Sequence, residues 1–322
     1  MSVNKKIKIA FHDNSLCLRG TTVATYDWAY WTRHYLDVDP IIMFNLNHHA
    51  NHKNAIDKFK KEFSVFGYED NNEIDKILDK NKCDSFFMIK GGEPDGVISS
   101  NCRNLINSVS GWWKPEWIHG DVYAMCSKWL SKKTDYKIPY VPHIVHLPDH
   151  NLDMRDELRI PKDAFVFGRN GGWETFDLPF VKQSIVETLE KRNDIWFIFQ
   201  YTEPFYKHER IIYLEPTADL NEKVKFINTS DAMLHARYIG ESFGLSCAEF
   251  SIRNKPIITY YNSFDRNHID TLGETGIYYE TKQDIDNILL NIDKNEINRL
   301  EWNCYKDHSP ENLVQKFKEI YL

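Results

Sequence analysis

The sequence predicts an α/β protein with two doubly wound, Rossmann-like domains that face each other across a cleft. Three observations support this prediction. The chain has 322 residues, about the length of two domains of average size. Short apolar runs alternate with longer amphipathic segments along the chain, which is typical of parallel sheets covered by helices. A proline-containing, loop-like stretch at residues 138–162 interrupts this alternation and is the best candidate for a domain boundary.

The composition excludes several classes of protein. The chain carries 40 basic and 47 acidic residues, a net charge of −7, with no basic stripe of the kind that binds nucleic acid. No apolar run approaches the roughly twenty residues of a membrane span, and we find no signal or transit peptide. The six cysteines are scattered without a C-x-x-C pair, as expected of free thiols in a reducing compartment. We therefore expect a cytoplasmic protein that has no transmembrane segment and no nucleic-acid partner.

The first domain is predicted to span residues 1–145. Its strands are expected in the apolar runs at residues 7–11, 41–44, 85–89 and 123–126. Gly20 and Thr21 follow the first run and precede a helical pattern over residues 23–31. A Gly and a Thr at a helix start can present backbone amides to a phosphate, or a Thr can simply cap the helix. The sequence leaves both interpretations open.

The second domain is predicted to span residues 146–310. Its strands are expected at residues 165–168, 196–200, 211–214, 232–235, 256–261 and 277–279, and its main helices at residues 178–191, 220–228 and 242–253. Ligands of doubly wound sheets lie beyond the carboxyl ends of the strands, so we expect binding residues in the following loops. Residues 311–322 form a predicted C-terminal helix that could pack back on the first domain.

The most informative segment is E-S-F-G-L-S-C-A-E, which begins at Glu241 and ends at Glu249. It follows a predicted strand, and its helix is expected to open near Ser242 or Phe243. Gly244 would let a ligand approach the first turn, where free amides form an anion site. Eight helical positions correspond to a rise of about 12 Å, which suits a ligand with hydroxyl groups at both ends and an anionic middle, such as a sugar–diphosphate–ribose. The alternative is an amphipathic helix with an acid near its N-terminus and a second, solvated acid.

This segment resembles the E-x-F-G-L-x-x-x-E signature of retaining GT-B glycosyltransferases of the family 4 type. The resemblance extends to residues 165–169, which end in Gly-Arg, to residues 230–235, to the Lys-Pro-Ile-Ile of residues 255–258 and to residues 273–277. It implies an enzyme that moves a sugar from a UDP- or GDP-sugar to a glycan or other hydroxyl acceptor, with retention of configuration. The nucleotide sugar would be a co-substrate, without a tightly bound cofactor or an obligatory metal.

The resemblance also implies roles for individual residues. Glu249 would bind the donor ribose, and Glu241, which with Arg169 is a catalytic candidate, would contact the sugar hydroxyls near the anomeric carbon. Arg169 would be the cation on the departing diphosphate. The remaining donor-binding candidates are the backbone of Ser242, Phe243, Gly244 and Leu245, then Asn170 and Gly171, and in the first domain Gly20 and Thr21.

The first domain contains low-specificity candidates for acceptor binding. Trp112 and Trp113 could stack on acceptor sugar rings, or they could pack in the protein, which is the commoner role of Trp. Many members of the family have a histidine beside the reacting centre. No histidine stands at the corresponding strand end here, and His119 is a nearby substitute unless its role is structural.

The chain departs from the family pattern after Arg169. The family usually has a Lys about five residues later, where this chain has Glu174 or Thr175. An active enzyme then needs another cation, for which Lys182 and Arg237 are candidates, or extra backbone donors from the Gly171-Gly172 pair. Two other functions therefore stay open, a nucleotide-sugar epimerase on the same fold and an inactive nucleotide-sugar binder. The histidine cluster at residues 48–52 lies in a polar segment with no nearby carboxylate except Asp57, and the cluster at residues 143–150 lies in the linker. We therefore expect no metal site.

Overall fold

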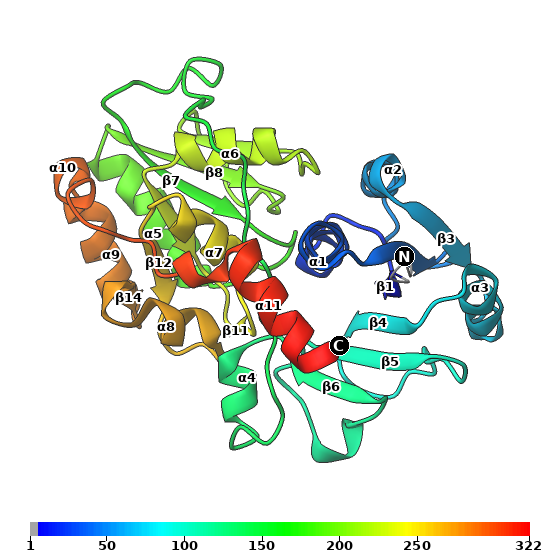
Figure 1. Ribbon diagram of the computed structural model, residues 1–322. Coiled ribbons are helices and arrows are strands. Elements are labelled where there is room, and N and C mark those ends of the chain that lie inside the picture. The colour runs from blue at the N-terminus through cyan, green and yellow to red at the C-terminus, as the bar shows by residue number, and fades with distance from the viewer. Residues whose placement is uncertain (1–5) are drawn as a thin grey trace. The chain divides into compact units, whose positions relative to one another are not determined.

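The computed structural model describes residues 6–322, which fold into two compact units. The first unit contains the described residues up to Ile144 together with Asp307–Leu322, and the second contains Val145–Lys306. Each unit is built around a six-stranded sheet with helices packed against it (Figure 1). All strand pairs found among the described residues are parallel, so the predicted α/β class with two doubly wound domains is confirmed.

The first sheet has the strand order β3-β2-β1-β4-β5-β6. Strand β1 lies in the middle, where Ala10 is opposite Ile41 of β2 on one side and Phe86 of β4 on the other. Both faces of this central region are buried, which explains its continuous apolar sequence. The strands are β1 Lys8–His12, β2 Asp39–Asn45, β3 Ser64–Tyr68, β4 Ser85–Lys90, β5 Arg103–Ser108 and β6 Val122–Met125.

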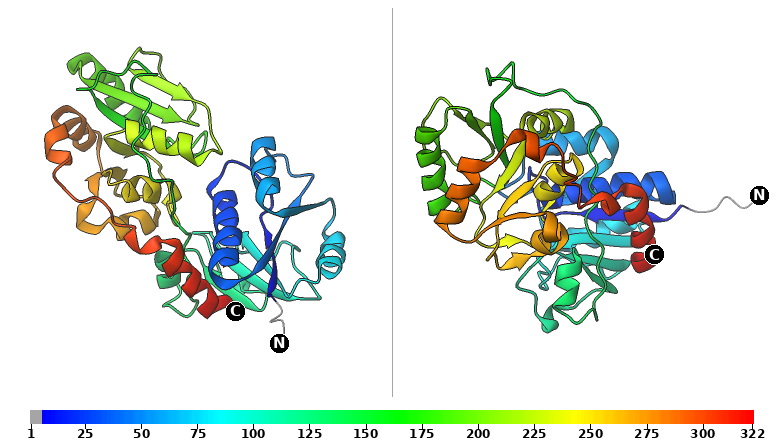
Figure 2. Two further views of the ribbon diagram at one scale, coloured as in Figure 1. Left: turned by 45° about the horizontal axis from the view of Figure 1, so that its top comes forward. Right: turned by 90° about the vertical axis from the view of Figure 1, so that its left-hand side faces the viewer.

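The last helix of the chain, α11, belongs to the first unit. Its Phe317 ring lies 5.0 Å from the ring of Trp28 in α1 and 5.2 Å from that of Phe87 in β4. The C-terminal segment therefore packs beside α1 and fills part of the first core (Figure 2). The helices of this unit are α1 Gly20–Leu36, α2 Lys53–Glu62, α3 Ile74–Asn81, α4 Lys128–Lys132 and α11 Pro310–Tyr321, with short 3₁₀ turns at Asn71–Glu73, Pro115–Trp117 and Lys306–His308.

The second sheet has the order β14-β12-β10-β7-β8-β9. Numbered within the unit, this is the same order as that of the first sheet, and it is the order of the Rossmann fold. The strands are β7 Phe165–Asn170, β8 Ile195–Gln200, β9 Ile211–Leu214, β10 Ala232–His235, β12 Ile257–Tyr260 and β14 Ile277–Tyr279. A separate two-stranded sheet pairs β11 Gly240–Glu241 with β13 Asp265–Arg266.

Helices cover both faces of the second sheet. On one face, α5 and α9 share a core with Phe167 of β7. On the other face α6 and α7 meet, with the rings of Phe226 and Phe250 6.1 Å apart. Gly168 of β7 packs closely against these helices. A Cβ on Gly168 would be only 2.0 Å from Oγ of Ser230, the residue at the end of α6. The helices are α5 Pro179–Lys191, α6 Leu220–Thr229, α7 Leu245–Ile252, α8 Asn267–Leu272, α9 Lys282–Asn291 and α10 Lys294–Ile297, with a 3₁₀ turn at Gly273–Thr275.

The segment that joins the two units is irregular, since residues 141–164 contain no helix or strand. Within the part of the chain that the structure describes, every helix falls short of the length and hydrophobicity that crossing a membrane requires. All six cysteines are free thiols.

Candidate functional site

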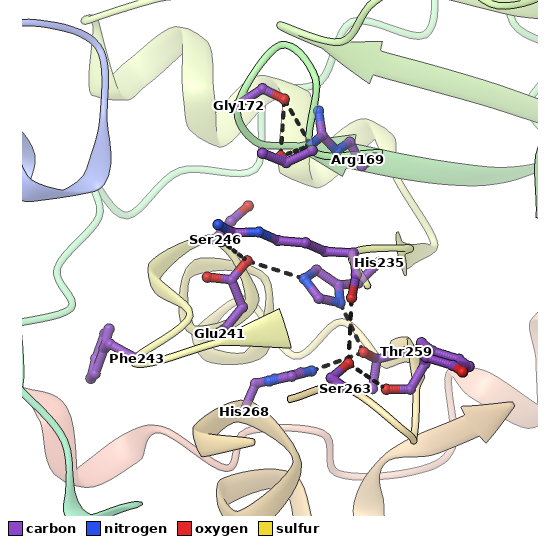
Figure 3. A network of polar contacts seen from close by, with 12 residues as sticks. Arg169, Gly172, His235, Glu241, Phe243, Ser246, Thr259, Ser263 and His268 are labelled. Carbon is purple, nitrogen blue, oxygen red and sulfur yellow. Dashed lines mark hydrogen bonds and ion pairs between the residues drawn. The ribbon is translucent and has the colours of Figure 1, made fainter. Parts of the chain in front are cut away.

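The second sheet reverses its strand order between β7 and β10. Ligands of doubly wound sheets bind at such a reversal, beyond the carboxyl ends of the strands. Strand β7 ends in Arg169 and Asn170, and β10 ends in His235. Figure 3 shows Arg169 and His235 together with Glu241, which follows β10, in one polar region.

Glu241 lies at the centre of this region. Its Oε1 accepts a hydrogen bond from Nη1 of Arg237 at 3.0 Å and another from Nε2 of His235 at 3.2 Å. Burial by itself raises the pKa of Glu241, but the hydrogen bond from His235 and the charge of Arg237 outweigh it and lower the pKa to about 2. Among residues 6–322 we find no hydrogen bond to its other oxygen, Oε2, and the side chain is 23% exposed. The site thus holds an ionised carboxylate with one oxygen open to a ligand.

Arg237 is the cation nearest to this carboxylate. Burial lowers the pKa of Arg237, but the charge of Glu241 and its hydrogen bond outweigh burial and raise the pKa. Of the two cations that the sequence offered as substitutes for the missing lysine, Arg237 is the one in the network. The ammonium of Lys182 instead lies over the ring of Phe205, at 5.5 Å from its centroid.

Arg169 is held by neutral groups of the chain itself. Its Nη1 donates to the Tyr201 carbonyl at 3.2 Å and to the hydroxyl of Thr202, and its Nη2 donates to the Gly172 carbonyl at 3.0 Å and to Thr175 Oγ1 at 2.5 Å. Burial lowers the pKa of Arg169 to about 10, so the guanidinium stays protonated at neutral pH.

The charges at these strand ends include two guanidiniums and one carboxylate, and the carboxylates of Asp177 and Asp265 also act on Arg237. Arg169 and Arg237 each carry one positive charge, and Glu241 carries one negative charge. The three groups lie within electrostatic range of one another, because Glu241 and Arg237 both shift the pKa of Arg169. Because the hydrogen bonds of Arg169 go to neutral groups, its guanidinium favours an anionic ligand.

The helix after Glu241 begins later than the sequence predicts. We expected it to open near Ser242 or Phe243, but α7 begins at Leu245. Gly244 precedes it with φ = 86°, a left-handed conformation that favours glycine, and provides no side-chain cap. The amides of the first turn have no intrahelical partner, as at any helix start. Ser246 Oγ donates to the Asn170 carbonyl at 2.7 Å, which places this helix start at the end of β7.

Two further expectations for this segment need correction. Phe243 lies outside the helix, and its side chain is buried against the ring of Tyr305 at 6.1 Å. Glu241 lies in β11, so the predicted helical rise of about 12 Å between Glu241 and Glu249 is wrong. Glu249 is one turn into α7, about 6 Å along the axis from Leu245.

Glu249 forms a buried ion pair that the sequence did not indicate. Its Oε1 lies 2.7 Å from Nζ of Lys223 in α6, and Glu249 is only 4% exposed. The alternative of a solvated acid is therefore wrong. A carboxylate held by one oxygen is still able to accept hydrogen bonds at the other.

A second row of polar residues lies behind Glu241. His235 Nδ1 is 2.8 Å from Thr259 Oγ1, and the same hydroxyl is 3.1 Å from Nε2 of His268 (Figure 3). Burial, together with the neighbouring His235, lowers the pKa of His268 well below its usual value, so this ring is neutral. His235 was predictable in principle, because it ends a strand at the reversal. Thr259 and His268 come from distant segments and have no local signal in the sequence.

The candidates near the first helix lie at the start of α1. Gly20 is its first residue, and Arg19 is the N-cap, without a side-chain cap. The interpretation of a Thr cap is therefore wrong. The neighbouring Thr22 is inside the helix, and its hydroxyl donates to Asp13 Oδ2 at 2.7 Å. Thr21 accepts a hydrogen bond at its carbonyl from Thr25 Oγ1 at 3.0 Å.

The acceptor candidates of the first unit differ in exposure. Trp112 is 60% exposed, whereas Trp113 is half-buried. His119 is held by the chain: its Nδ1 lies 2.7 Å from the Trp117 carbonyl and its Nε2 lies 3.3 Å from Nζ of Lys90. These contacts fix the orientation of the His119 ring within the first unit.

Within residues 6–322, no three His, Cys, Asp or Glu side chains come together as a set that could hold a metal ion. His52, one of the clustered histidines, accepts the amide of Asn54 with its ring and so caps α2.

No protein-family model and no curated protein sequence matches the chain. Solved structures, by contrast, match nearly all of it. A glycosyltransferase from Rickettsia africae ESF-5 has a TM-score of 0.71 at 13% identity and covers 98% of both chains. Anabaena Alr3699/HepE in complex with UDP and glucose has a TM-score of 0.71 at 12% identity, over 97% of this chain and 98% of its own. A UDP-N-acetylglucosamine 2-epimerase has a TM-score of 0.61 at 12% identity, over 98% and 97%. The chain therefore has the GT-B fold that its sequence predicts.

Proposed function

We propose that this protein is a retaining GT-B glycosyltransferase of the family 4 type, which moves a sugar from a UDP- or GDP-sugar to a saccharide hydroxyl. The observation that supports this most is the state of Glu241. One carboxylate oxygen is held by Arg237 and His235, and the other has no hydrogen bond within the described chain. Sugar hydroxyls are donors that such an oxygen accepts. The solved structures of similar fold include glycosyltransferases and a protein bound to UDP and glucose.

The second unit would bind the donor. Arg237 and the amides at the start of α7 would bind the diphosphate oxygens, and Arg169, whose terminal N–H groups donate to the chain, would act on the diphosphate through its charge. Glu249 would bind the ribose with its second oxygen. Around them, the remaining donor contacts would come from Asn170, Gly171 and the backbone of Ser242, Phe243, Gly244 and Leu245.

The first unit would bind the acceptor, with Trp112 and Trp113 beside its sugar rings and His119 near them. Gly20 and Thr21 at the start of α1 would approach the donor diphosphate. We place the enzyme in the cytoplasm, where its free cysteines stay reduced.

Arg237 would replace the lysine that the family has after Arg169. In the proposed reaction the acceptor oxygen attacks the anomeric carbon while the bond from that carbon to the diphosphate breaks, and the acceptor proton moves to a diphosphate oxygen. Glu241 would contact the donor sugar through Oε2, since Oε1 accepts from Arg237 and His235, and the proposed reaction forms no covalent bond to it. The two guanidiniums would stabilise the leaving charge without a metal ion.

A second candidate is a nucleotide-sugar epimerase, because the similar folds include UDP-N-acetylglucosamine 2-epimerases. The absence of the family lysine supports a third, a binder without activity. Two consecutive experiments separate the three functions, first a binding screen and then an incubation of the donor that binds. A thermal-shift screen of UDP, GDP and their sugars identifies the ligand, because a ligand at 100 times its Kd adds about 2.7 kcal/mol of stability.

The labelled donor that binds is then incubated with an acceptor panel, with and without EDTA. Transfer that survives EDTA supports the proposal, an isomerised donor supports the epimerase, and binding without turnover supports the inactive binder. Glu241→Gln should abolish the preference for the nucleotide sugar over the bare nucleotide. Glu209→Gln, which changes an exposed residue of the same unit, is the matched control.

A further inference from the structure

One buried hydroxyl joins two histidines behind Glu241. Thr259 Oγ1 lies between Nδ1 of His235 at 2.8 Å and Nε2 of His268 at 3.1 Å. Thr259 and His268 are completely buried, and His235 is 6% exposed. The three residues come from β12, α8 and the end of β10, so the contact is tertiary.

His268, Thr259 and His235 form a row of hydrogen bonds that ends at Glu241. The donors and acceptors show in which direction each of these hydrogen bonds is donated. The ionised carboxylate of Glu241 can only accept, so Nε2 of His235 carries a proton. In a neutral His235 the other nitrogen, Nδ1, is then bare and accepts from the Thr259 hydroxyl. Because that hydroxyl has a single proton, its oxygen accepts from Nε2–H of His268.

The end of the row agrees with this direction. Nδ1 of His268 is buried and has no hydrogen bond within residues 6–322. In the direction given, this nitrogen is bare, whereas the opposite direction would leave it as a buried N–H without an acceptor. Orphaned N–H groups are the rarer and costlier case in folded proteins.

Both ends of the row are fixed by the fold. The Tyr279 hydroxyl donates to the His235 carbonyl at 2.8 Å. Next to His268, Asn267 donates through Nδ2 to the Phe243 carbonyl at 2.8 Å, which ties α8 to the segment after Glu241. A Cβ added to Gly244 would be 3.2 Å from Glu241 Cβ and 3.3 Å from His268 Cβ, so these side chains are closely packed.

We propose that His235, Thr259 and His268 are positioning residues that fix the orientation of Glu241, with Oε1 turned to the protein and Oε2 turned to the donor sugar. The inference rests on the proposed function only for the identity of the ligand. The row fixes the His235 tautomer whose Nε2–H holds Oε1, and Arg237 binds the same oxygen. Without the hydrogen bond from Thr259, the proton of His235 could move to Nδ1. Its bare Nε2 would then face the carboxylate of Glu241, and the two groups, both acceptors, would repel each other.

The first test needs no ligand. Nitrogen-15 spectra of the histidine rings in the wild-type protein should show His235 and His268 as Nε2–H tautomers, with peaks assigned from His235→Gln and His268→Gln. An Nδ1–H tautomer for either ring would overturn the inference. Thr259→Val, which removes the hydroxyl at nearly constant shape, should release the His235 tautomer, and Thr259→Ser should restore it.

The second test separates the inference from the proposed function. Calorimetry compares UDP with UDP-glucose, and GDP with GDP-mannose, on the wild type, Thr259→Val, Thr259→Ser and Glu241→Gln. Thr259→Val should weaken binding of the nucleotide sugar about tenfold and leave the affinity for the bare nucleotide unchanged. Thr259→Ser should restore the affinity for the nucleotide sugar. If no nucleotide binds the wild type, the proposed function fails. If nucleotides bind, and Glu241→Gln weakens binding of the nucleotide sugar but Thr259→Val does not, the proposed positioning role of His235, Thr259 and His268 is wrong.

Discussion

Lys223 of α6 and Glu249 of α7 provide a test of both stability and binding. Their Nζ and Oε1 atoms lie 2.7 Å apart, and the side chains are only 10% and 5% exposed. Breaking such a pair leaves an uncompensated buried charge, so Lys223→Met or Glu249→Met should each lower the free energy of unfolding by about 3–5 kcal/mol. Replacing both with Met removes both charges, and the double variant should recover most of this loss.

Urea unfolding followed by circular dichroism measures the four proteins of this cycle. The matched control is the exposed pair of Lys225 with Glu222 on the same helix, where the side chains are 29% and 42% exposed. Lys225→Met should change the free energy of unfolding by less than about 1 kcal/mol. A double variant as unstable as the single variants would refute the reasoning about the buried pair.

The stable double variant then separates the two roles of Glu249. Calorimetric titration should show at least about tenfold weaker binding of UDP or GDP, because the proposed hydrogen bonds to the ribose are lost. Wild-type affinity for the nucleotide in this folded variant would contradict the ribose contact and leave Glu249 with a structural role only.

Three other expectations follow from the structure. Arg237→Gln should lower kcat for transfer by about 10²–10³, whereas Lys182→Gln should have little effect, and equal losses in steady-state assays would contradict the assignment of Arg237. Gly244→Ala should cost at least about 1–2 kcal/mol in urea unfolding, because φ is 86° and the new Cβ would be 3.2 Å from that of Glu241; unchanged stability would contradict this. Burial and the charge of Lys90 lower the pKa of His12 from 6.5 to about 3, so the unfolded chain takes up a proton before the folded one. Its contribution to stability is therefore lost as pH falls from 6.5 towards 3, by about 2 kcal/mol between pH 7 and pH 5, and His12→Gln should flatten this slope in pH-dependent unfolding.

The central strands of both sheets were predictable from the sequence, because they are buried on both faces and read as continuous apolar runs. Strands β3 and β5 were not among the predicted runs. Strand β3 is at the edge of the first sheet and is mostly half-exposed. Strand β5 is buried but polar, and Nδ2 of its Asn107 donates a hydrogen bond to the Val141 carbonyl at 2.9 Å. Such a partner depends on the tertiary fold, so local sequence does not reveal it.

The candidate site shows the same limit. The order of strand, loop and helix over residues 232–253 was predictable, but the predicted helix start was wrong because Gly244 adopts a left-handed conformation and Glu241 pairs in a strand with Arg266. The partner of Glu249 is on another helix, and His268 reaches the site only through the packing of α8. Spacing along one segment carries no information about these contacts.

The two sheets share one strand order, so topology alone offers a ligand site in each unit. Charge distinguishes them. At the reversal of the first sheet, the ammonium of Lys90 is paired with Asp95 and also donates to the Val97 carbonyl at 3.1 Å, so its charge is neutralised by the chain. At the reversal of the second sheet, Arg237 is paired with Glu241, whereas the hydrogen bonds of Arg169 go to neutral groups, next to a helix start without a side-chain cap. A diphosphate gains more from a guanidinium that neutral groups hold than from an ammonium already in an ion pair, which is why we assign the nucleotide to the second unit and the uncharged acceptor to the first.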